Sequence, residues 1–320
     1  MQFYLAPLEG LTGYIFRNAL AKYFTPLDKY FTPFIAANQK GKLSSRELKD
    51  ILPEHNPSIK VIPQILTNKV EDFNLTVKHL QAYGYDEVNL NLGCPSGTVV
   101  SKNKGAGFLA VPDDLDHFLE GIFNEAPLKI SIKTRLGKDD PSEFQNLIRV
   151  FNKYPLEELI IHPRIQKDYY KNTPRLEQFE EGLSKSQHPI CYNGDIFTAS
   201  DYHQLTQRYP QLERVMLGRG LIANPGLVEE INLQKALDIK TFKAFHDEVY
   251  ANYQEVLHGE RDVLFKMKEM WFYMAYMFED VEKQAKKIKK SQRLTDYEAA
   301  VEELFATKSL IKGAGLFHKS

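Results

Sequence analysis

One short segment of the sequence combines the residue types that proton transfer to a ligand requires. Residues 89–97 read NLNLGCPSG, so Cys94 directly follows a strand-like run and stands between Gly93 and Pro95. Glycine and proline bend the backbone sharply, and a thiol on such a turn can reach a bound ligand. An isolated cysteine is more often inert packing, as we expect for Cys191 inside the apolar run PICYN. Cys94 is therefore the candidate catalytic residue.

Two further strand-like runs end in cationic or protonatable groups. Lys133 and Arg135 close the run SIKTR, and His162 and Arg164 close the run IIHPR. A lysine is seldom buried without a partner, so Lys133 inside a strand needs an anionic or hydrogen-bonding group beside it. Taken alone, either group could be ordinary: a lysine that turns to solvent, or a histidine bound to backbone carbonyls. Together they indicate a ligand site.

The next two strand-like runs are followed by turns of small residues, NGD at 193–195 and GRG at 218–220. Small residues let backbone amides approach a phosphate, and Arg219 can add a charge-assisted contact. Either turn alone is common, but neighbouring strands that both carry one indicate a phosphate-binding corner. No GxGxxG follows the first strand, which argues against a tightly held dinucleotide on a Rossmann unit.

The segments that must position these groups alternate regularly between the hydrophobic period of a strand and that of a helix. Strand patterns occur at 2–6, 30–36, 60–66, 86–91, 128–134, 158–162, 189–193 and 214–217. Helical patterns occur at 13–22, 44–50, 70–83, 113–125, 142–153, 175–183, 199–208 and 226–236. Asp113 and Thr198 are expected to cap two of these helices. Such alternation predicts a parallel sheet. A doubly wound open sheet is the alternative, but eight similar units favour closure into a (β/α)₈ TIM barrel.

Polar residues mark one end of this predicted barrel. They fall at or just after the carboxyl ends of the strands, where barrel enzymes place their chemistry. The residues are Glu9, Gln64, Asn91, Lys133, His162, Asn193 and Arg219.

The alternation stops near residue 241. From there helices are predicted at 241–257, 262–280, 282–290 and 295–307. We therefore expect an α/β protein with a barrel over residues 1–238 and a small all-helical domain over residues 239–320. Trp271 to Phe278 is far shorter than the roughly 20 apolar residues that cross a bilayer, so no membrane span is expected.

The bulk composition narrows the class of protein further. Two cysteines provide neither a disulfide framework nor a paired metal motif, so we expect no metal and a reducing cytoplasm. The 41 basic residues balance 42 acidic ones, so affinity for nucleic acid would have to come from a local patch. Residues 283–293, KQAKKIKKSQR, are such a patch, although a solvated helix face would look the same.

Together these segments resemble the tRNA-dihydrouridine synthases, flavoproteins that reduce a uridine of tRNA. The resemblance spans the whole barrel in order and spacing. Its matching pieces are 6–10 (APLEG), 63–64 (PQ), 89–95 (NLNLGCP), Gly105, Gly107, 133–135 (KTR), 162–164 (HPR), 193–195 (NGD) and 218–219 (GR).

The resemblance implies FMN-dependent reduction of a tRNA uridine to 5,6-dihydrouridine, with NADPH as the reductant. Hydride would pass from the flavin to C6, and Cys94 would give a proton to C5 as a neutral thiol. Asn91, Arg135 and Arg164 would hold the uracil, and the helical domain would help to bind the tRNA. The enzyme would be a monomer. The implied FMN-binding residues are Pro7, Leu8, Gln64, Lys133, His162, Asn193, Asp195, Gly218 and Arg219.

Three other functions stay open at this point. A flavin-dependent dehydrogenase of a free pyrimidine, of the dihydroorotate or dihydropyrimidine type, would share the barrel but has no need of a helical domain. A Schiff-base aldolase would use Lys133 as its nucleophile. A catalytically silent RNA-binding protein would tolerate replacement of Cys94 by alanine.

Overall fold

The computed structural model describes residues 1–316, and residues 317–320 of the predicted helical domain lie outside the described residues. The chain forms two compact units. The barrel unit comprises Met1–Pro7, Asp28–Gly194 and Leu212–Met216, and the helical unit comprises Leu8–Leu27, Asp195–Gln211 and the chain from Leu217 on. A domain boundary at residue 238 stays a prediction.

The described strands form one sheet in which every named strand pairing is parallel, with the order β3-β5-β6-β7-β8-β9-β10-β1-β2-β4. Because β2 and β3 are consecutive, and β4 and β5 are too, the two ends of this order meet and the sheet closes. This confirms the predicted barrel. The strands are β1 (Gln2–Leu5), β2 (Lys29–Phe31), β3 (Ile35–Ala36), β4 (Val61–Ile62), β5 (Gln64–Leu66), β6 (Glu87–Leu92), β7 (Lys129–Gly137), β8 (Leu159–Ile165), β9 (Ile190–Tyr192) and β10 (Arg214–Leu217).

The sheet contains ten strands where the sequence predicted eight. Pro33 separates β2 from β3, and Pro63 separates β4 from β5. Proline cannot donate a hydrogen bond to the ladder, so each predicted strand is divided into two short pieces.

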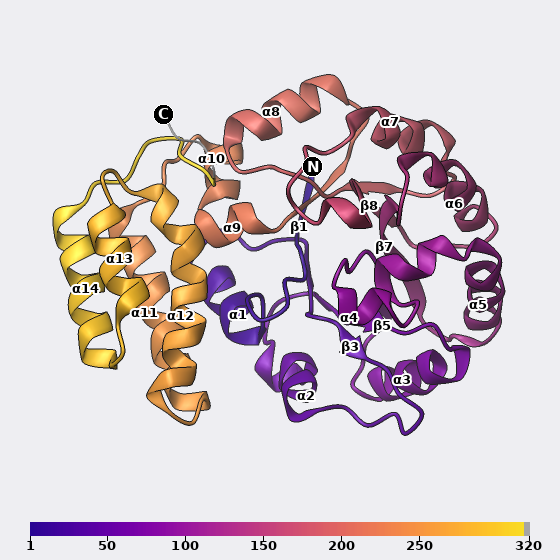
Figure 1. The fold of residues 1–320 in the computed structure, drawn as a ribbon, viewed down its shortest axis with the longest axis horizontal. Coiled ribbons are helices and arrows are strands. Elements are labelled where there is room, and N and C mark those ends of the chain that lie inside the picture. Colours follow the sequence, from indigo (N-terminus) through magenta and orange to yellow (C-terminus); the bar gives the residue numbers. More distant parts are fainter. Residues whose placement is uncertain (317–320) are drawn as a thin grey trace. The chain divides into compact units, whose positions relative to one another are not determined.

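Helices of the barrel unit surround its strands, with α3, α5, α6 and α7 on the outside (Figure 1). The expected cap at Asp113 is wrong. Pro112 at the first helical position starts α5 one residue earlier, and Asp113 lies inside the helix. The helices are α2 (Ser45–Ile51), α3 (Val70–Ala82), α4 (Gly97–Val100), α5 (Pro112–Glu125), α6 (Phe144–Phe151) and α7 (Leu176–Lys185), together with the 3₁₀ turn η2 (Gly105–Ala110).

The helical unit packs around an aromatic core. Trp271 is buried against Phe278 and Phe305, which confirms that it belongs to the core. Thr198 forms the expected cap, a capping box with Asp201. No helix among residues 1–316 is long and apolar enough to span a membrane. The helices are α1 (Tyr14–Tyr23), α8 (Ala199–Arg208), α9 (Arg219–Ala223), α10 (Leu227–Leu233), α11 (Ile239–Val256), α12 (Glu260–Met274), α13 (Glu282–Lys290) and α14 (Leu294–Thr307).

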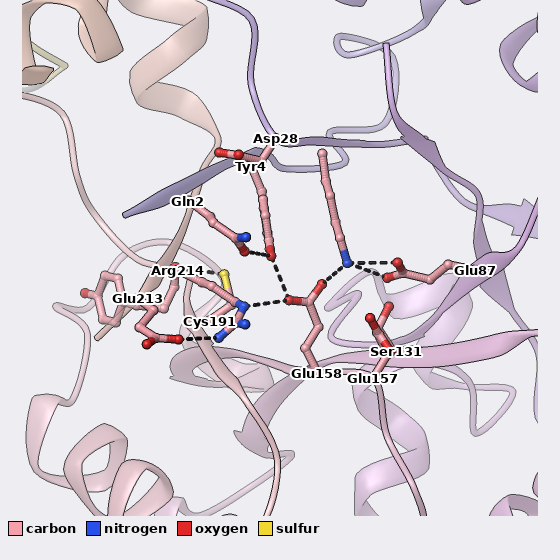
Figure 2. Close-up of polar contacts among 12 residues, drawn as sticks. Gln2, Tyr4, Asp28, Glu87, Ser131, Glu157, Glu158, Cys191, Glu213 and Arg214 are labelled. Atoms are coloured by element: carbon pink, nitrogen blue, oxygen red, sulfur yellow. Dashed lines mark hydrogen bonds and ion pairs between the residues drawn. The ribbon is translucent and has the colours of Figure 1, made fainter. Parts of the chain in front are cut away.

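An ionic cluster lies at the amino-terminal ends of the barrel strands. The Lys29 ammonium contacts both oxygens of Glu87 at 2.8 Å and Glu158 Oε1 at 2.9 Å. Glu158 also accepts a hydrogen bond from the Tyr4 hydroxyl at 2.9 Å and lies 3.7 Å from Arg214 (Figure 2). Burial raises the pKa of Glu87 against the opposing effect of Lys29. This buried cluster joins five segments of the barrel.

Candidate functional site

Cys94 lies on a tightly held turn after the carboxyl end of β6. Its backbone N–H donates to Asn91 Oδ1 at 2.9 Å, and its carbonyl accepts from the Ala106 N–H at 3.0 Å. Gly105 packs against this turn with φ of 56°, where a Cβ atom would lie 2.9 Å from the Cys94 carbonyl oxygen, so glycine is required. Cys94 forms no disulfide and is half-buried. The turn therefore fixes the backbone of Cys94, and the residue keeps part of its surface accessible.

A chain of hydrogen-bonded side-chain amides holds the residue that anchors this turn. Asn91 Nδ2 donates to Gln64 Oε1 at 2.7 Å, and Gln64 Nε2 donates to Asn89 Oδ1 at 2.8 Å. Asn89 Nδ2 then donates to Ser131 Oγ at 3.0 Å. Because the Gly93 and Cys94 N–H groups can only donate, they fix Asn91 Oδ1 as an acceptor and thereby orient every amide that follows.

Lys133 is the neighbour of Asn91 in the β6–β7 ladder. No group among residues 1–316 forms a hydrogen bond or an ion pair with its ammonium. Desolvation by burial, reinforced by the positive charge of Arg135, lowers the pKa of Lys133 to about 7. The side chain nevertheless keeps part of its surface accessible. A cation of this kind is suited to an anionic ligand.

Arg135 is buried and bound to backbone carbonyls. Its Nε, NH1 and NH2 atoms donate to the carbonyl oxygens of Gly93, Ile165 and Tyr169, each at 2.9 Å. Its guanidinium also lies over the ring of Tyr170, 5.5 Å from the centroid. These contacts tie the cysteine turn to the loop after β8. The predicted contact of Arg135 with a uracil stays a prediction.

His162 and Arg164 contact each other at the end of β8. Arg164 NH1 lies 3.0 Å from His162 Nε2 and, since a guanidinium can only donate, that nitrogen accepts. A neutral His162 therefore carries its proton on Nδ1. Arg164 Nε donates to the Asn172 carbonyl at 2.5 Å.

The loop that follows β8 is organised by Asp168. Its carboxylate accepts from the Ile165 N–H at 2.9 Å and from Asn172 Nδ2 at 2.5 Å, and it forms an ion pair with Arg175. Desolvation would raise the pKa of Asp168, but the hydrogen bonds from Arg175, Asn172 and Ile165 outweigh it and lower this pKa to about 2. Gln166 Nε2 donates to the Pro95 carbonyl at 2.9 Å and so links the loop to the cysteine turn.

The residues expected to bind FMN divide between the two units. Pro7, Gln64, Lys133, His162 and Asn193 belong to the barrel unit, whereas Leu8, Asp195, Gly218 and Arg219 belong to the helical unit.

Within the helical unit, Arg219 NH2 contacts Asp195 Oδ1 at 2.6 Å, and the guanidinium lies 5.2 Å from the Phe197 ring centroid. Within the barrel unit, Asn193 Nδ2 donates to the Met216 carbonyl at 2.9 Å.

Sequence reasoning missed the polar residues that support the site. Asn89 and Ser131 were not singled out, although each lies two residues before a predicted site residue and therefore points to the same side of its strand. That spacing was the available signal. Asp168 and Gln166 lie in an irregular loop, where no periodic pattern exists to reveal them.

Within the described part of the chain, a closed parallel barrel places a thiol, a lysine without a polar partner and a chain of amides around the carboxyl ends of β6 and β7. This is the framework of a barrel enzyme. The family model described as dihydrouridine synthase matches residues 4–311. The chain belongs to the dihydrouridine synthase family.

Several relatives carry names from the same family. A protein of Staphylococcus aureus strain Mu50 named "Probable tRNA-dihydrouridine synthase" is 29% identical over 237 residues, 71% of this chain and 70% of its own. A protein of Bacillus subtilis strain 168 named "Probable tRNA-dihydrouridine synthase 2" is 25% identical over 238 residues, 71% of each chain.

Among solved structures, a morphinone reductase mutant in complex with tetrahydroNAD aligns with a TM-score of 0.54 at 13% identity, covering 75% of this chain and 90% of its own. A variant of NCR from Zymomonas mobilis aligns with a TM-score of 0.51 at 14% identity, with the same coverage. These similarities support the barrel fold.

Proposed function

We propose that this protein reduces a uridine in tRNA to 5,6-dihydrouridine, with FMN as its cofactor and NADPH as the reductant. The observation that carries this proposal is the pair formed by Cys94 and Lys133. Cys94 is a half-buried residue on the fixed turn after β6, and Lys133 on the neighbouring strand β7 has an ammonium without a partner among residues 1–316. Family membership supplies the reaction class. The enzyme would act in the cytoplasm as a monomer.

The donor set of the barrel unit fits a flavin. Lys133 offers an ammonium that no group among residues 1–316 pairs with, and Gln64 and Asn193 offer amides at the carboxyl end of the barrel. An anionic ligand would return the pKa of Lys133 toward its ordinary value by supplying the missing negative charge. Bound FMN, once reduced by NADPH, would supply the hydride that reaches C6 of the uracil.

Cys94 supplies the proton in this proposal. Addition of hydride at C6 of a conjugated carbonyl leaves an enolate-like carbon at C5, which requires a positioned acid. The Cys94 thiol is such an acid because hydrogen bonds hold its turn on both sides. Asn91, Arg135 and Arg164 remain our candidates for the residues that hold the uracil edge. The target base must leave its stack to reach them.

The experiment that tests the proposal is mass spectrometry of unmodified tRNA after incubation with the protein, FMN and NADPH. We expect one uridine to gain the mass of two hydrogen atoms. Cys94→Ala should slow this gain by about 100-fold or more, the scale of a lost general acid. Cys191→Ala is the matched control, because Cys191 is fully buried in the barrel core and its loss should cost stability only.

Two results would reject the proposal. Oxidation of NADPH with free pyrimidines but not with tRNA would favour the small-molecule dehydrogenase. A colourless protein that borohydride links to a carbonyl substrate through Lys133 would favour the aldolase.

A further inference from the structure

The turn after β1, residues 8–12, is closed by hydrogen bonds of its own. The Leu8 carbonyl accepts from the N–H groups of Leu11 and Thr12, each at 3.0 Å. The Thr12 hydroxyl accepts from the Leu8 N–H at 2.7 Å. Gly10 has a φ of 82°, in the left-handed region that favours glycine. These contacts give the turn a defined shape.

A lysine from a distant helix of the same unit holds the tip of this turn. Lys266 on α12 donates from its ammonium to the Gly10 carbonyl at 2.8 Å. Among residues 1–316 this is the one hydrogen bond or ion pair that the Lys266 side chain forms. A Cβ atom at Gly10 would lie 3.4 Å from Lys266 Nζ and 3.5 Å from Glu269 Oε2, so α12 packs directly against the turn.

A second basic side chain holds the other end of the turn. Arg17 of α1 is fully buried, and its NH1 donates to the Thr12 carbonyl at 2.9 Å. Hydrogen bonds from charged donors are stronger than those between neutral groups. The turn is thus fixed at Thr12 by the helix that follows it and at Gly10 by a helix about 250 residues later in the chain.

The turn bears on the flavin site through Leu8. Leu8 and the preceding Pro7 are both expected to bind FMN, and both are partly exposed. Proline has no N–H to donate, and the Leu8 N–H is already bound to Thr12. These residues would therefore act mainly through side-chain contact with the flavin. Such contact depends on where the turn lies, because a gap of about 0.5–1 Å already forfeits roughly a quarter to a half of the dispersion attraction.

We propose that Lys266 is a positioning residue for the flavin site, which holds the turn of residues 8–12 where Leu8 contacts FMN. This inference rests on the proposed function, which makes FMN the cofactor. It gives α12 a part in holding the cofactor that does not depend on tRNA. Loss of the ammonium leaves the turn closed but free to shift, and so weakens the binding of FMN while the fold persists.

The test compares two lysines of α12 that form the same kind of bond. Lys266→Met removes the bond to the Gly10 carbonyl, and Lys268→Met removes a bond to the carbonyl of Ser291, which follows α13. Both lysines are partly exposed, so the two variants should lose similar stability. FMN affinity is measured on the holoenzyme, from the flavin fluorescence that appears on dilution. We expect Lys266→Met to raise the Kd for FMN about 10-fold, the scale of one lost hydrogen bond from a charged group, and Lys268→Met to leave it unchanged.

A second measurement needs no cofactor. Hydrogen exchange at the amides of Leu11 and Thr12, which close the turn, is followed in the full-length protein stripped of flavin. Lys266→Met should speed this exchange several-fold, and Lys268→Met should not. Lys266→Arg keeps a charged donor for the Gly10 carbonyl and should restore both the exchange rate and the affinity for FMN.

Three results would overturn the proposal: an unchanged Kd for FMN in Lys266→Met, equal weakening by Lys266→Met and Lys268→Met, or unchanged exchange of the turn in Lys266→Met. The last result with a raised Kd would mean that the ammonium contacts the flavin itself. Failure of the proposed function gives a different result. A wild-type protein that binds FMN but leaves tRNA unreduced rejects that function, while the Kd values and exchange rates still report on Lys266. A wild-type protein that binds no FMN rejects both.

Discussion

The side chain of Asn91 holds the backbone of Cys94: Asn91 Oδ1 accepts the Cys94 N–H at 2.9 Å and the Gly93 N–H at 3.0 Å. Asn91 in turn is held by Gln64, the first residue of the neighbouring strand β5. The position of the thiol therefore depends on the packing of β5 against β6.

Asn91→Ala should slow formation of dihydrouridine by about 10- to 100-fold. The variant leaves the partly buried N–H groups of Gly93 and Cys94 without their acceptor, which costs about 1–3 kcal/mol. If this cost adds to the activation free energy, each 1.4 kcal/mol or so slows the reaction tenfold. Because Asn91 is also a candidate for binding the uracil, the rate at which a thiol reagent modifies Cys94 in the absence of tRNA separates the two roles. If that rate is the same in the variant and the wild type, Asn91 does not position the thiol.

The lowered pKa of Lys133 predicts how the stability of the ligand-free protein depends on pH. The pKa of this group is about 7 in the folded state and 10.5 in the reference state. Between these values the unfolded chain binds a proton that the folded protein lacks, so the free energy of unfolding rises with pH across this window. Below pH 7 both states are protonated, and the cost of the buried charge is fully present.

Lys133→Met should remove this rise. Denaturant unfolding at pH 6.5 and at pH 9.5 measures this rise in the free energy of unfolding. If the free energy rises no more in the wild-type protein than in the variant, the prediction is contradicted. In addition, FMN binding should take up a proton at pH 8, which calorimetry in buffers of different ionisation enthalpy detects.

Asp168→Asn should loosen the loop after β8. Its pKa of about 2 lies below the ordinary value of 3.8, so the carboxylate stabilises the fold fully above pH 4 and loses this effect as the pH falls toward 2. The variant should therefore be less stable than the wild type at pH 7, and the difference should shrink in acid. Thermal melts at pH 7 and pH 3 test this, and an equal difference at both would exclude an ionic role.

Lys29→Met should destabilise the barrel by about 3–5 kcal/mol, because it leaves the buried Glu87 carboxylate without its cation and leaves Glu158 only the ion pair with Arg214 at 3.7 Å. Lys129 is the matched control. It also begins a strand and forms an ion pair, with Glu157, but 60% of its side chain is exposed, so Lys129→Met should cost less than about 1 kcal/mol. Denaturant unfolding of both variants decides whether burial makes the difference.

The sequence predicted the barrel well because its signals are local. Hydrophobic period and turn residues set each strand and helix, and the capping box at Thr198 uses residues only three apart. The division of strands at Pro33 and Pro63 was also readable, since proline interrupts a ladder wherever it lies. The short helix α9 was missed because five residues are too few to show a period.

The sequence named candidate site residues, but it could not predict the contacts that hold them. Cys94 and Lys133 stand out by type and position, whereas the bond between Gln64 and Asn91 joins residues 27 apart and depends on barrel register. Arg135 shows the limit most clearly. Its charge suggested a ligand, yet three of its donors bind carbonyls 30 to 42 residues away, which only the folded loops bring into reach.

The barrel can close only after its last strand has been synthesised. Strand β1 pairs with β2 and lies beside β10 in the sheet order, and the Gln2 N–H donates to the carbonyl of Glu213, about 210 residues later in the chain. At ribosomal speed the first strand waits roughly 10–40 s for that partner. During translation the apolar interior behind Tyr4 stays open at this seam. We therefore expect the nascent chain to expose apolar surface at this seam until β10 has left the ribosome.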